Sequence, residues 1–193
     1  MMNWALLLIA LQATPQGTES VASAIDAAAR GGVVIACRHG TTNQADPEDE
    51  TTLRYGDPST QRRLSPAGER QGEAVGAALS RLGIRFSEVI ASPMQRAHRT
   101  AELMAGPVVL DSLWHTRGDN YDARRTARRN ALSRPVQNGN RLIVSHVGTL
   151  SSTLKFRGSM AEGDCVVIRP RGNDYDELGL VPWQEWIAYR KDP

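Results

Sequence analysis

The sequence predicts one α/β domain, a three-layer α/β/α sandwich around a mostly parallel central sheet. Short apolar runs alternate with helical patterns along the chain, which is the order that parallel β-α-β units require. Three of these runs, residues 33–36, 89–91 and 142–144, are apolar at every position, as is typical of strands buried on both faces. A length of 193 residues, 40% of them hydrophobic, suits a single well-buried core.

Each predicted helix begins or ends at a recognisable signal. Ser20 can cap the first helix, and Gly31 and Gly32 end it. Ser-Pro pairs at 65–66 and 92–93 start two more helices, because proline is already set for the first helical position. Helices are expected over residues 20–30, from 65 to 82, from 92 onward, over 121–134 and over 149–155.

The remaining segments are predicted to be strands and one long connection. Strands are expected over residues 33–36, 89–91, 108–110, 141–145, 165–168 and 179–181. The last two strands, joined by a turn at 171–174, are expected at an edge of the sheet. Residues 41–63 are polar and aperiodic, and their length indicates a flap over a pocket. Trp183 and Trp186 are expected to close the core.

The three apolar runs lead directly into polar and cationic residues. Arg38 and His39 follow the first run, Arg96 comes shortly after the second, and His146 follows the third. Parallel strands end at the same edge of a sheet, where open α/β sheets bind their ligands. A guanidinium holds two phosphoryl oxygens at once, and an unprotonated imidazole is a good nucleophile. The sequence therefore predicts a phosphate site that contains a histidine nucleophile.

A known family shares these residues and their order. The string Arg38-His39-Gly40 resembles the RHG signature of the histidine phosphatase superfamily, which includes cofactor-dependent phosphoglycerate mutases and many phosphatases. Segments 64–71, 92–101 and 145–148 resemble three further motifs of that family, in the family's order. The resemblance spans residues 33–170. It implies a phosphoglycerate mutase-like fold of the branch 1 type and a phosphatase that uses no metal and no cofactor.

The resemblance also implies a role for each matched residue. His39 would be the phosphorylated nucleophile, and Arg38, Arg96 and His146 would bind the phosphoryl group. Thr42, three positions after the nucleophile, falls where the family often has a hydroxyl near the phosphate. Two alternatives stay open at this point: a phosphomutase of the same superfamily, and a non-catalytic module that binds phosphorylated ligands.

The proton donor for the leaving group is not identified by any motif. Many relatives use a glutamate after the third strand, but this chain has none between residues 102 and 162. We expect Asp119 to serve, although a helix cap or a turn would equally explain an aspartate there. Asp122, Glu162, Asp164 or no dedicated acid are the alternatives.

The predicted partner is a small phosphomonoester, with a sugar phosphate or a phosphopeptide as alternatives. A net charge of +2 gives no support for nucleic-acid binding. One predicted helix repeats arginine at helical spacing, and we expect that face to be solvated because no aromatic residues interleave with the charges. These are Arg124, Arg125, Arg128 and Arg129.

Residues 1–13 are expected to be a signal peptide, which leaves residues 14–193 as the domain. The apolar run at 4–11 is too short to span a bilayer, and Ala13 suits cleavage. We therefore expect a periplasmic or secreted protein, or a cytoplasmic one if this run is not a signal.

The cysteines and histidines do not indicate a metal site. Cys37 and Cys165 could form a disulfide only if the fold brings them together, and we favour two unpaired buried cysteines. The four histidines lack the spacing of zinc ligands.

Overall fold

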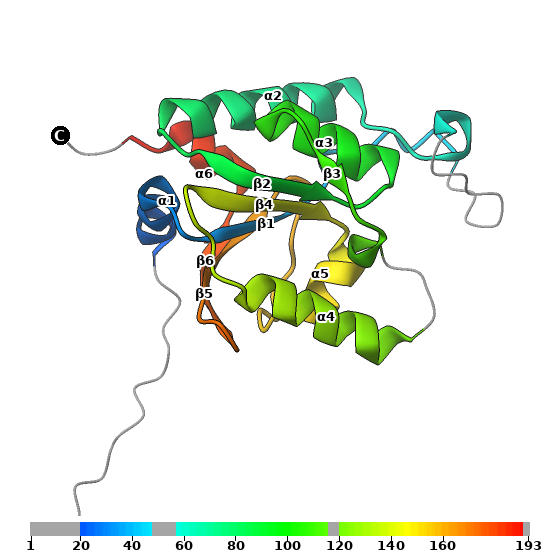
Figure 1. Cartoon of the computed structure of the whole chain (residues 1–193). Coiled ribbons are helices and arrows are strands. Elements are labelled where there is room, and N and C mark those ends of the chain that lie inside the picture. Colours follow the sequence, from blue (N-terminus) through cyan, green and yellow to red (C-terminus); the bar gives the residue numbers. More distant parts are fainter. Residues whose placement is uncertain (1–19, 48–56, 116–119, 191–193) are drawn as a thin grey trace, which may run out of the picture.

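In a computed structural model, residues 20–47, 57–115 and 120–190 are described, and they form the predicted α/β fold (Figure 1). The six strands follow one another across the sheet in the order β3-β2-β4-β1-β5-β6. The first four in this order are parallel, and β5 and β6 run antiparallel to their neighbours. Their bounds are β1 Val34–Arg38, β2 Phe86–Ala91, β3 Val109–Leu110, β4 Asn140–Ser145, β5 Cys165–Pro170 and β6 Tyr175–Val181.

Helices cover both faces of the sheet. Figure 1 shows α2, α3 and α6 above it and α4 and α5 below it. Helix α1 packs with the first group in one core. The bounds are α1 Val21–Arg30, α2 Pro66–Arg81, α3 Gln95–Ala105, α4 Tyr121–Ser133, α5 Val147–Thr153 and α6 Trp183–Ala188, with two 3-10 turns, η1 Pro58–Thr60 and η2 Ser112–Trp114. The predicted three-layer sandwich is confirmed.

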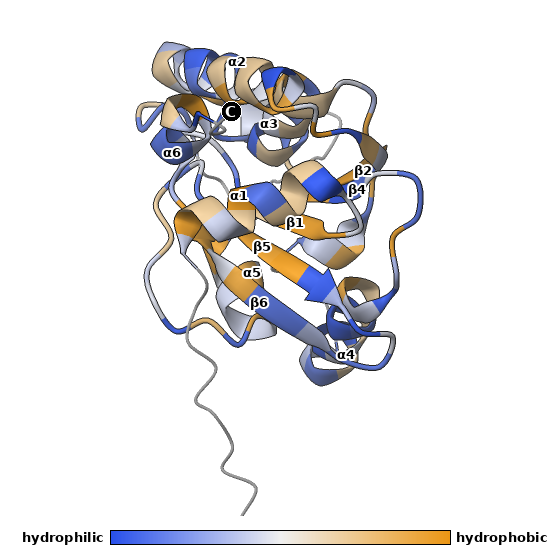
Figure 2. Ribbon diagram, turned by 90° about the vertical axis from the view of Figure 1, so that its left-hand side faces the viewer, coloured by the Kyte–Doolittle hydropathy of each residue, from blue (hydrophilic) through white to orange (hydrophobic). Residues whose placement is uncertain are grey.

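The central strands contribute to a separate core on each face. Along β1, Ile35 and Cys37 face the α1, α2, α3 and α6 side, whereas Val34 and Ala36 face the α4 and α5 side. All four side chains are completely buried. Burial on both faces explains why the strand sequence is apolar at every position. Figure 2 shows the same hydrophobic colouring along β5, between helices with hydrophilic outer faces.

The C-terminal part differs from the sequence prediction in one respect. Strand β5 pairs with β1, so it lies inside the sheet. Of the last two strands, only β6 lies at an edge. Trp186 is completely buried and Trp183 packs against the same core, as expected. No helix in the described ranges is long and apolar enough to cross a membrane.

Helix α2 packs closely on the loop that follows β1. Ser65 caps the helix, because its hydroxyl accepts from the Gly68 amide at 3.1 Å. A Cβ atom on Gly68 would lie 2.0 Å from the carbonyl oxygen of Thr41, so only glycine fits there. One turn further on, Gln71 accepts from the Thr41 amide at 2.9 Å. The helix thereby fixes the backbone directly after His39.

The two described ends of the predicted flap are joined to each other. Arg63 donates to the Asp46 carboxylate from its Nε at 2.9 Å and from its backbone amide at 3.0 Å. These hydrogen bonds lower the pKa of Asp46 to about 2. The pair thus closes the base of the segment. Residues 48–56, the middle of the predicted flap, lie outside the described residues.

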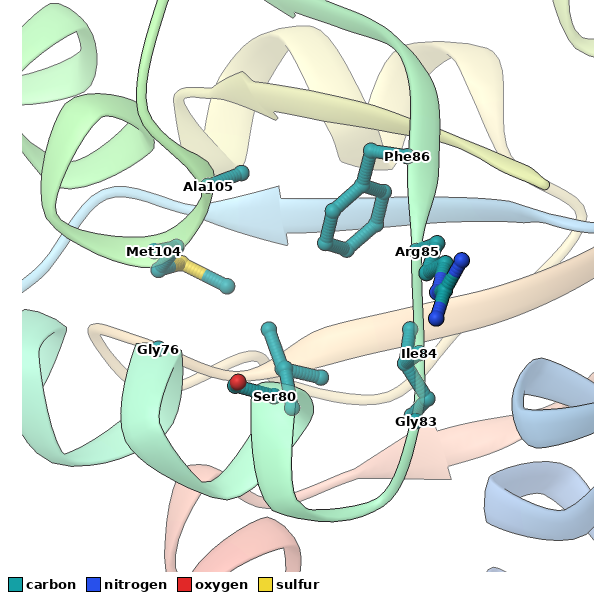
Figure 3. A pocket seen from close by; sticks show the side chains of 9 residues that line it. Gly76, Ser80, Gly83, Ile84, Arg85, Phe86, Met104 and Ala105 are labelled. Atoms are coloured by element: carbon teal, nitrogen blue, oxygen red, sulfur yellow. The ribbon is translucent and has the colours of Figure 1, made fainter.

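A surface pocket lies at the amino-terminal end of β2 (Figure 3). It has a volume of about 490 Å³, and Phe86 and Met104 line it together with residues of α2. The phosphate site is predicted at the carboxyl end of the same strand, so this pocket is not part of it.

Candidate active site

The three strand tips meet at one edge of the sheet, as predicted. Strand β4 lies between β1 and β2, and Arg38 is in register with Ser145. His39 and His146, which follow β1 and β4, have ring centroids 5.4 Å apart. Ser92, directly after β2, pairs through its hydroxyl with Nε2 of His146 at 2.9 Å. Helix α3 therefore begins at Gln95 rather than at Ser92, whose side chain is used in the site.

His39 presents an unprotonated nitrogen to the site. Its Nδ1 lies 2.9 Å from the carbonyl oxygen of Gly40, which can only accept, so the ring proton belongs on Nδ1. Arg96 donates from Nε to Nε2 of His39 at 3.2 Å. Burial is the largest effect on the pKa of His39; together with the charges of Arg96, Arg38 and Arg62 it lowers that pKa to about 3, against the opposing effect of the Gly40 hydrogen bond. Nε2 therefore keeps its lone pair at neutral pH.

Arg38 and His146 each keep a buried nitrogen that has no hydrogen-bond partner in the described part of the chain. Arg38 donates from Nη1 to the Met160 carbonyl at 2.8 Å, but its Nε has no acceptor there. The Nδ1 of His146 is in the same situation. Burial and the nearby charges hold the pKa of His146 well below its usual value. Unsatisfied buried polar atoms are uncommon, and a bound oxyanion would satisfy these two.

Arg62 is a functional candidate that the sequence prediction missed. Its charge is one of those that lower the pKa of His39, so its guanidinium lies within electrostatic reach of the site. The neighbouring Gln61 is buried, and its side chain accepts from the Gln95 amide at 2.7 Å, which fastens this segment to the start of α3. Arg62 belongs to no periodic pattern, so its place in the site is set by tertiary structure.

Thr42 lies beside Glu162 at the rim of the site. Its hydroxyl donates to Oε1 of Glu162 at 3.2 Å, and the same oxygen lies 3.4 Å from Nη2 of Arg38. The structure thus brings Thr42 and one of the alternative acids together with a predicted phosphate ligand.

The other predicted acids do not reach the site in the described residues. Asp164 accepts from the backbone amides of Ala161 at 2.9 Å and Trp183 at 3.2 Å, which is a structural role. Asp122 is exposed in the first turn of α4. Asp119 lies outside the described residues, so its role stays a prediction.

The expectation of two unpaired cysteines is wrong. Cys37 and Cys165 lie opposite each other on the antiparallel pair β1 and β5, and they form a disulfide with Cα atoms 4.0 Å apart. Register between the two strands brings them together, and the sequence does not reveal that register. The loop before β5 also holds the site directly, since Gly163 donates to the His39 carbonyl and Arg38 donates to the Asp164 carbonyl, both at 2.9 Å.

The expected solvated arginine face on α4 is also incorrect for two residues. Arg128 is buried, and both it and Arg124 donate to backbone carbonyls of the turn at 112–115. That turn ends in His115, to which the sequence assigned no role, and the His115 ring lies edge-on to that of His146. His98, by contrast, is a half-exposed partner of Glu102 on the outer face of α3.

Comparison with known proteins agrees with this geometry. Residues 34–117 match the family model of the histidine phosphatase superfamily (branch 1). The protein histidine phosphatase SixA, solved with tungstate, superposes with a TM-score of 0.61 at 14% identity and covers 79% of this chain and 98% of its own. No curated protein matches the sequence.

Two further solved structures share the fold. A phosphoserine phosphatase mutant from Entamoeba histolytica, solved with phosphoserine, gives a TM-score of 0.52 at 16% identity, over 79% of this chain and 98% of its own. The ecdysone phosphate phosphatase from Bombyx mori, solved with tungstate, gives 0.53 at 13% identity, over 77% and 92%. Residues 34–117 of the chain thus resemble the histidine phosphatase superfamily (branch 1), and the described part of the chain shares the fold of the solved phosphatases.

Proposed function

We propose that the protein is a metal-independent phosphomonoesterase that works through a phosphorylated His39. The observation that carries this proposal is the orientation of the His39 ring. Because Nδ1 is bound to the Gly40 carbonyl, the unprotonated Nε2 is the nitrogen that faces Arg96. A nucleophile surrounded by guanidinium groups suits a reaction in which negative charge is transferred to it.

The proposed reaction has two steps. In the first, Nε2 of His39 forms a bond to phosphorus while the bond from phosphorus to the leaving oxygen breaks, and that oxygen takes up a proton. In the second, water attacks phosphorus and gives up a proton, the P–N bond breaks, and inorganic phosphate leaves. Arg38, Arg62, Arg96 and His146 stabilise the charge on the equatorial oxygens throughout.

The proposed substrate is a small phosphomonoester, with a sugar phosphate or a phosphopeptide as alternatives. Two relatives with this fold were solved with tungstate, a tetrahedral oxyanion like phosphate, and a third was solved with phosphoserine. The buried Arg38 Nε and His146 Nδ1 supply donors for such an anion here. Thr42 is proposed to act at the edge of this pocket through Glu162.

The wild-type enzyme tests the proposal. We expect hydrolysis of 4-nitrophenyl phosphate to continue in excess chelator, and we expect rapid quenching to trap a phosphoryl group that mass spectrometry maps to His39. Loss of activity on chelation would contradict the metal-free mechanism. Phosphate binding without turnover would indicate a binding module, and transfer between phosphoglycerates would indicate a mutase.

We also propose that the enzyme works in the periplasm or outside the cell, after removal of residues 1–13. That leader lies outside the described residues. The Cys37–Cys165 disulfide supports the proposal, because disulfides persist in oxidising compartments and are rare in the cytosol. We expect cell fractionation to find a chain that begins near Thr14 with both cysteines oxidised. A full-length cytoplasmic chain with free thiols would argue against export.

A further inference from the structure

His115 lies beside the proposed phosphoryl pocket. Along the order of strands in the sheet, His115 and Glu162 lie on opposite sides of that pocket. His115 follows η2, which comes directly after β3, whereas Glu162 precedes β5. The ring of His115 is 5% exposed, and its centroid lies 5.6 Å from that of His146 at an interplanar angle of 81°. His146 in turn lies 5.4 Å from His39. A second titratable ring is therefore packed against the proposed phosphate-binding histidine.

The turn that carries His115 is held by side-chain hydrogen bonds to three successive backbone carbonyls. Arg128 donates to the carbonyl of Leu113 at 2.7 Å and to that of His115 at 3.0 Å. The hydroxyl of Ser145 donates to the Trp114 carbonyl at 2.5 Å. Ser145 is the residue just before His146, so the turn is tied to the strand tip itself. The position of His115 relative to the site is thus determined by both α4 and β4.

Arg128, which holds this turn, is buried, and burying its charge is energetically unfavourable. Arg128 is 2% exposed, and the acceptors of these two hydrogen bonds are neutral carbonyls. A buried guanidinium that is paired with carbonyls rather than a carboxylate is unfavourable compared with an apolar side chain of similar size. Both acceptors lie in the 112–115 turn, so the guanidinium holds that turn against α4.

The charges around His115 suit a proton that moves during the reaction. Burial, the largest effect, and the charges of Arg96 from α3 and of Arg124 and Arg128 from α4 together lower the pKa of His115 to about 4. A phosphoryl dianion bound at Arg96 would offset this cationic charge and raise the pKa of His115. A bound dianion therefore favours the protonated ring, and departure of the negative charge favours the neutral one.

We propose that His115 transfers the proton to and from the reacting oxygens, the role for which the sequence predicted Asp119. The inference rests on the proposed phosphatase function. In the first step the imidazolium of His115 gives its proton to the leaving oxygen as the P–O bond breaks. In the second step its neutral imidazole takes a proton from the attacking water, which restores the imidazolium before phosphate leaves. Arg124 and Arg128 are positioning residues for it.

Two substrates that differ in their need for a proton test this role. The 4-nitrophenolate ion leaves without protonation, whereas glycerol must be protonated as it leaves glycerol 2-phosphate. We expect His115→Gln to lower kcat/KM for glycerol 2-phosphate by about 10²- to 10⁴-fold, and kcat/KM for 4-nitrophenyl phosphate by less than about tenfold. His115→Glu is expected to recover part of the lost activity on glycerol 2-phosphate, because a carboxyl group can move the same proton.

The ratio of the two rates is the decisive quantity, because it does not depend on the folded fraction of a preparation. His98→Gln, on the outer face of α3, is the matched control and should leave both rates unchanged. An unchanged ratio in His115→Gln would overturn the inference, as would a ratio shifted only by Glu162→Gln or Asp119→Asn. In each of these cases a wild type active in chelator leaves the phosphatase proposal standing. A wild type inactive on both substrates would defeat the phosphatase proposal itself.

Discussion

Replacing His39 with alanine is expected to lower kcat/KM for 4-nitrophenyl phosphate by at least about 10⁴-fold, since the proposed covalent intermediate forms on this imidazole. His146, the nearest imidazole, has its Nε2 paired with Ser92, and its ring centroid lies 5.4 Å from that of His39. It therefore cannot take over the attack without a rearrangement of the site. Steady-state kinetics with the activated substrate measure the loss, and rapid quenching should find no phosphoenzyme.

The matched control for this prediction is His98→Ala, which deletes the same ring from the surface of α3. It should retain wild-type kcat/KM. The His39 variant should remain folded, because the ring is neutral and its removal costs the hydrogen bonds to Gly40 and from Arg96 without removing an ion pair. Residual activity within tenfold of the wild type would show that phosphorus is attacked by some other group, with His39 only binding the substrate.

Removing the disulfide is expected to cost about 3–5 kcal/mol of unfolding free energy. The two cysteines are separated by 128 residues, and a cross-link across so long a loop strongly restricts the unfolded chain. For a domain of this size the loss corresponds to a melting temperature lower by roughly 6–20 °C. The variant to measure is Cys37→Ala with Cys165→Ala, because both positions are completely buried and would not tolerate a polar replacement.

Reductant provides the internal control for the disulfide. Wild-type protein in dithiothreitol should unfold at nearly the same temperature as the double variant, and the double variant should not respond to dithiothreitol. Hydrogen bonds from Gly163 and to Asp164 still hold the backbone of His39 and Arg38, so the folded variant should keep most of its activity. Equal stability of wild type and variant would mean that the bond contributes no net stability.

The residues on strand tips were predictable because buried parallel strands have a distinctive sequence. A run such as 142–144 is apolar at every position only when both faces are covered, and its end then marks the ligand edge. Arg38, His39 and His146 follow such runs directly. Their positions, and the start of α2 after Ser65, depend on signals within a few residues of each other along the chain. For α3 the sequence predicts a start at Ser92, and the helix begins at Gln95 instead.

The residues that were missed depend on contacts between distant segments. Arg62 and His115 come from irregular segments, and nothing in their neighbours indicates that they face the site. Arg128 has a helical spacing typical of a solvated face, but the 112–115 turn covers it. Local periodicity cannot show which helix face a loop will cover.

Strand β1 pairs with strands that come much later in the chain, so the site can form only after those strands have been synthesised. Val34 lies between Arg141 of β4 and Ile168 of β5, so the strand directly before the proposed nucleophile has neither neighbour until most of the chain has been synthesised. Non-local pairing of this kind forms slowly, because the entropy cost of closing a long loop comes before any stabilising contact is made. A chain still emerging from the ribosome therefore holds all of His39's own segment without the neighbouring strand tips, and the proposed phosphate pocket assembles only at the end of folding.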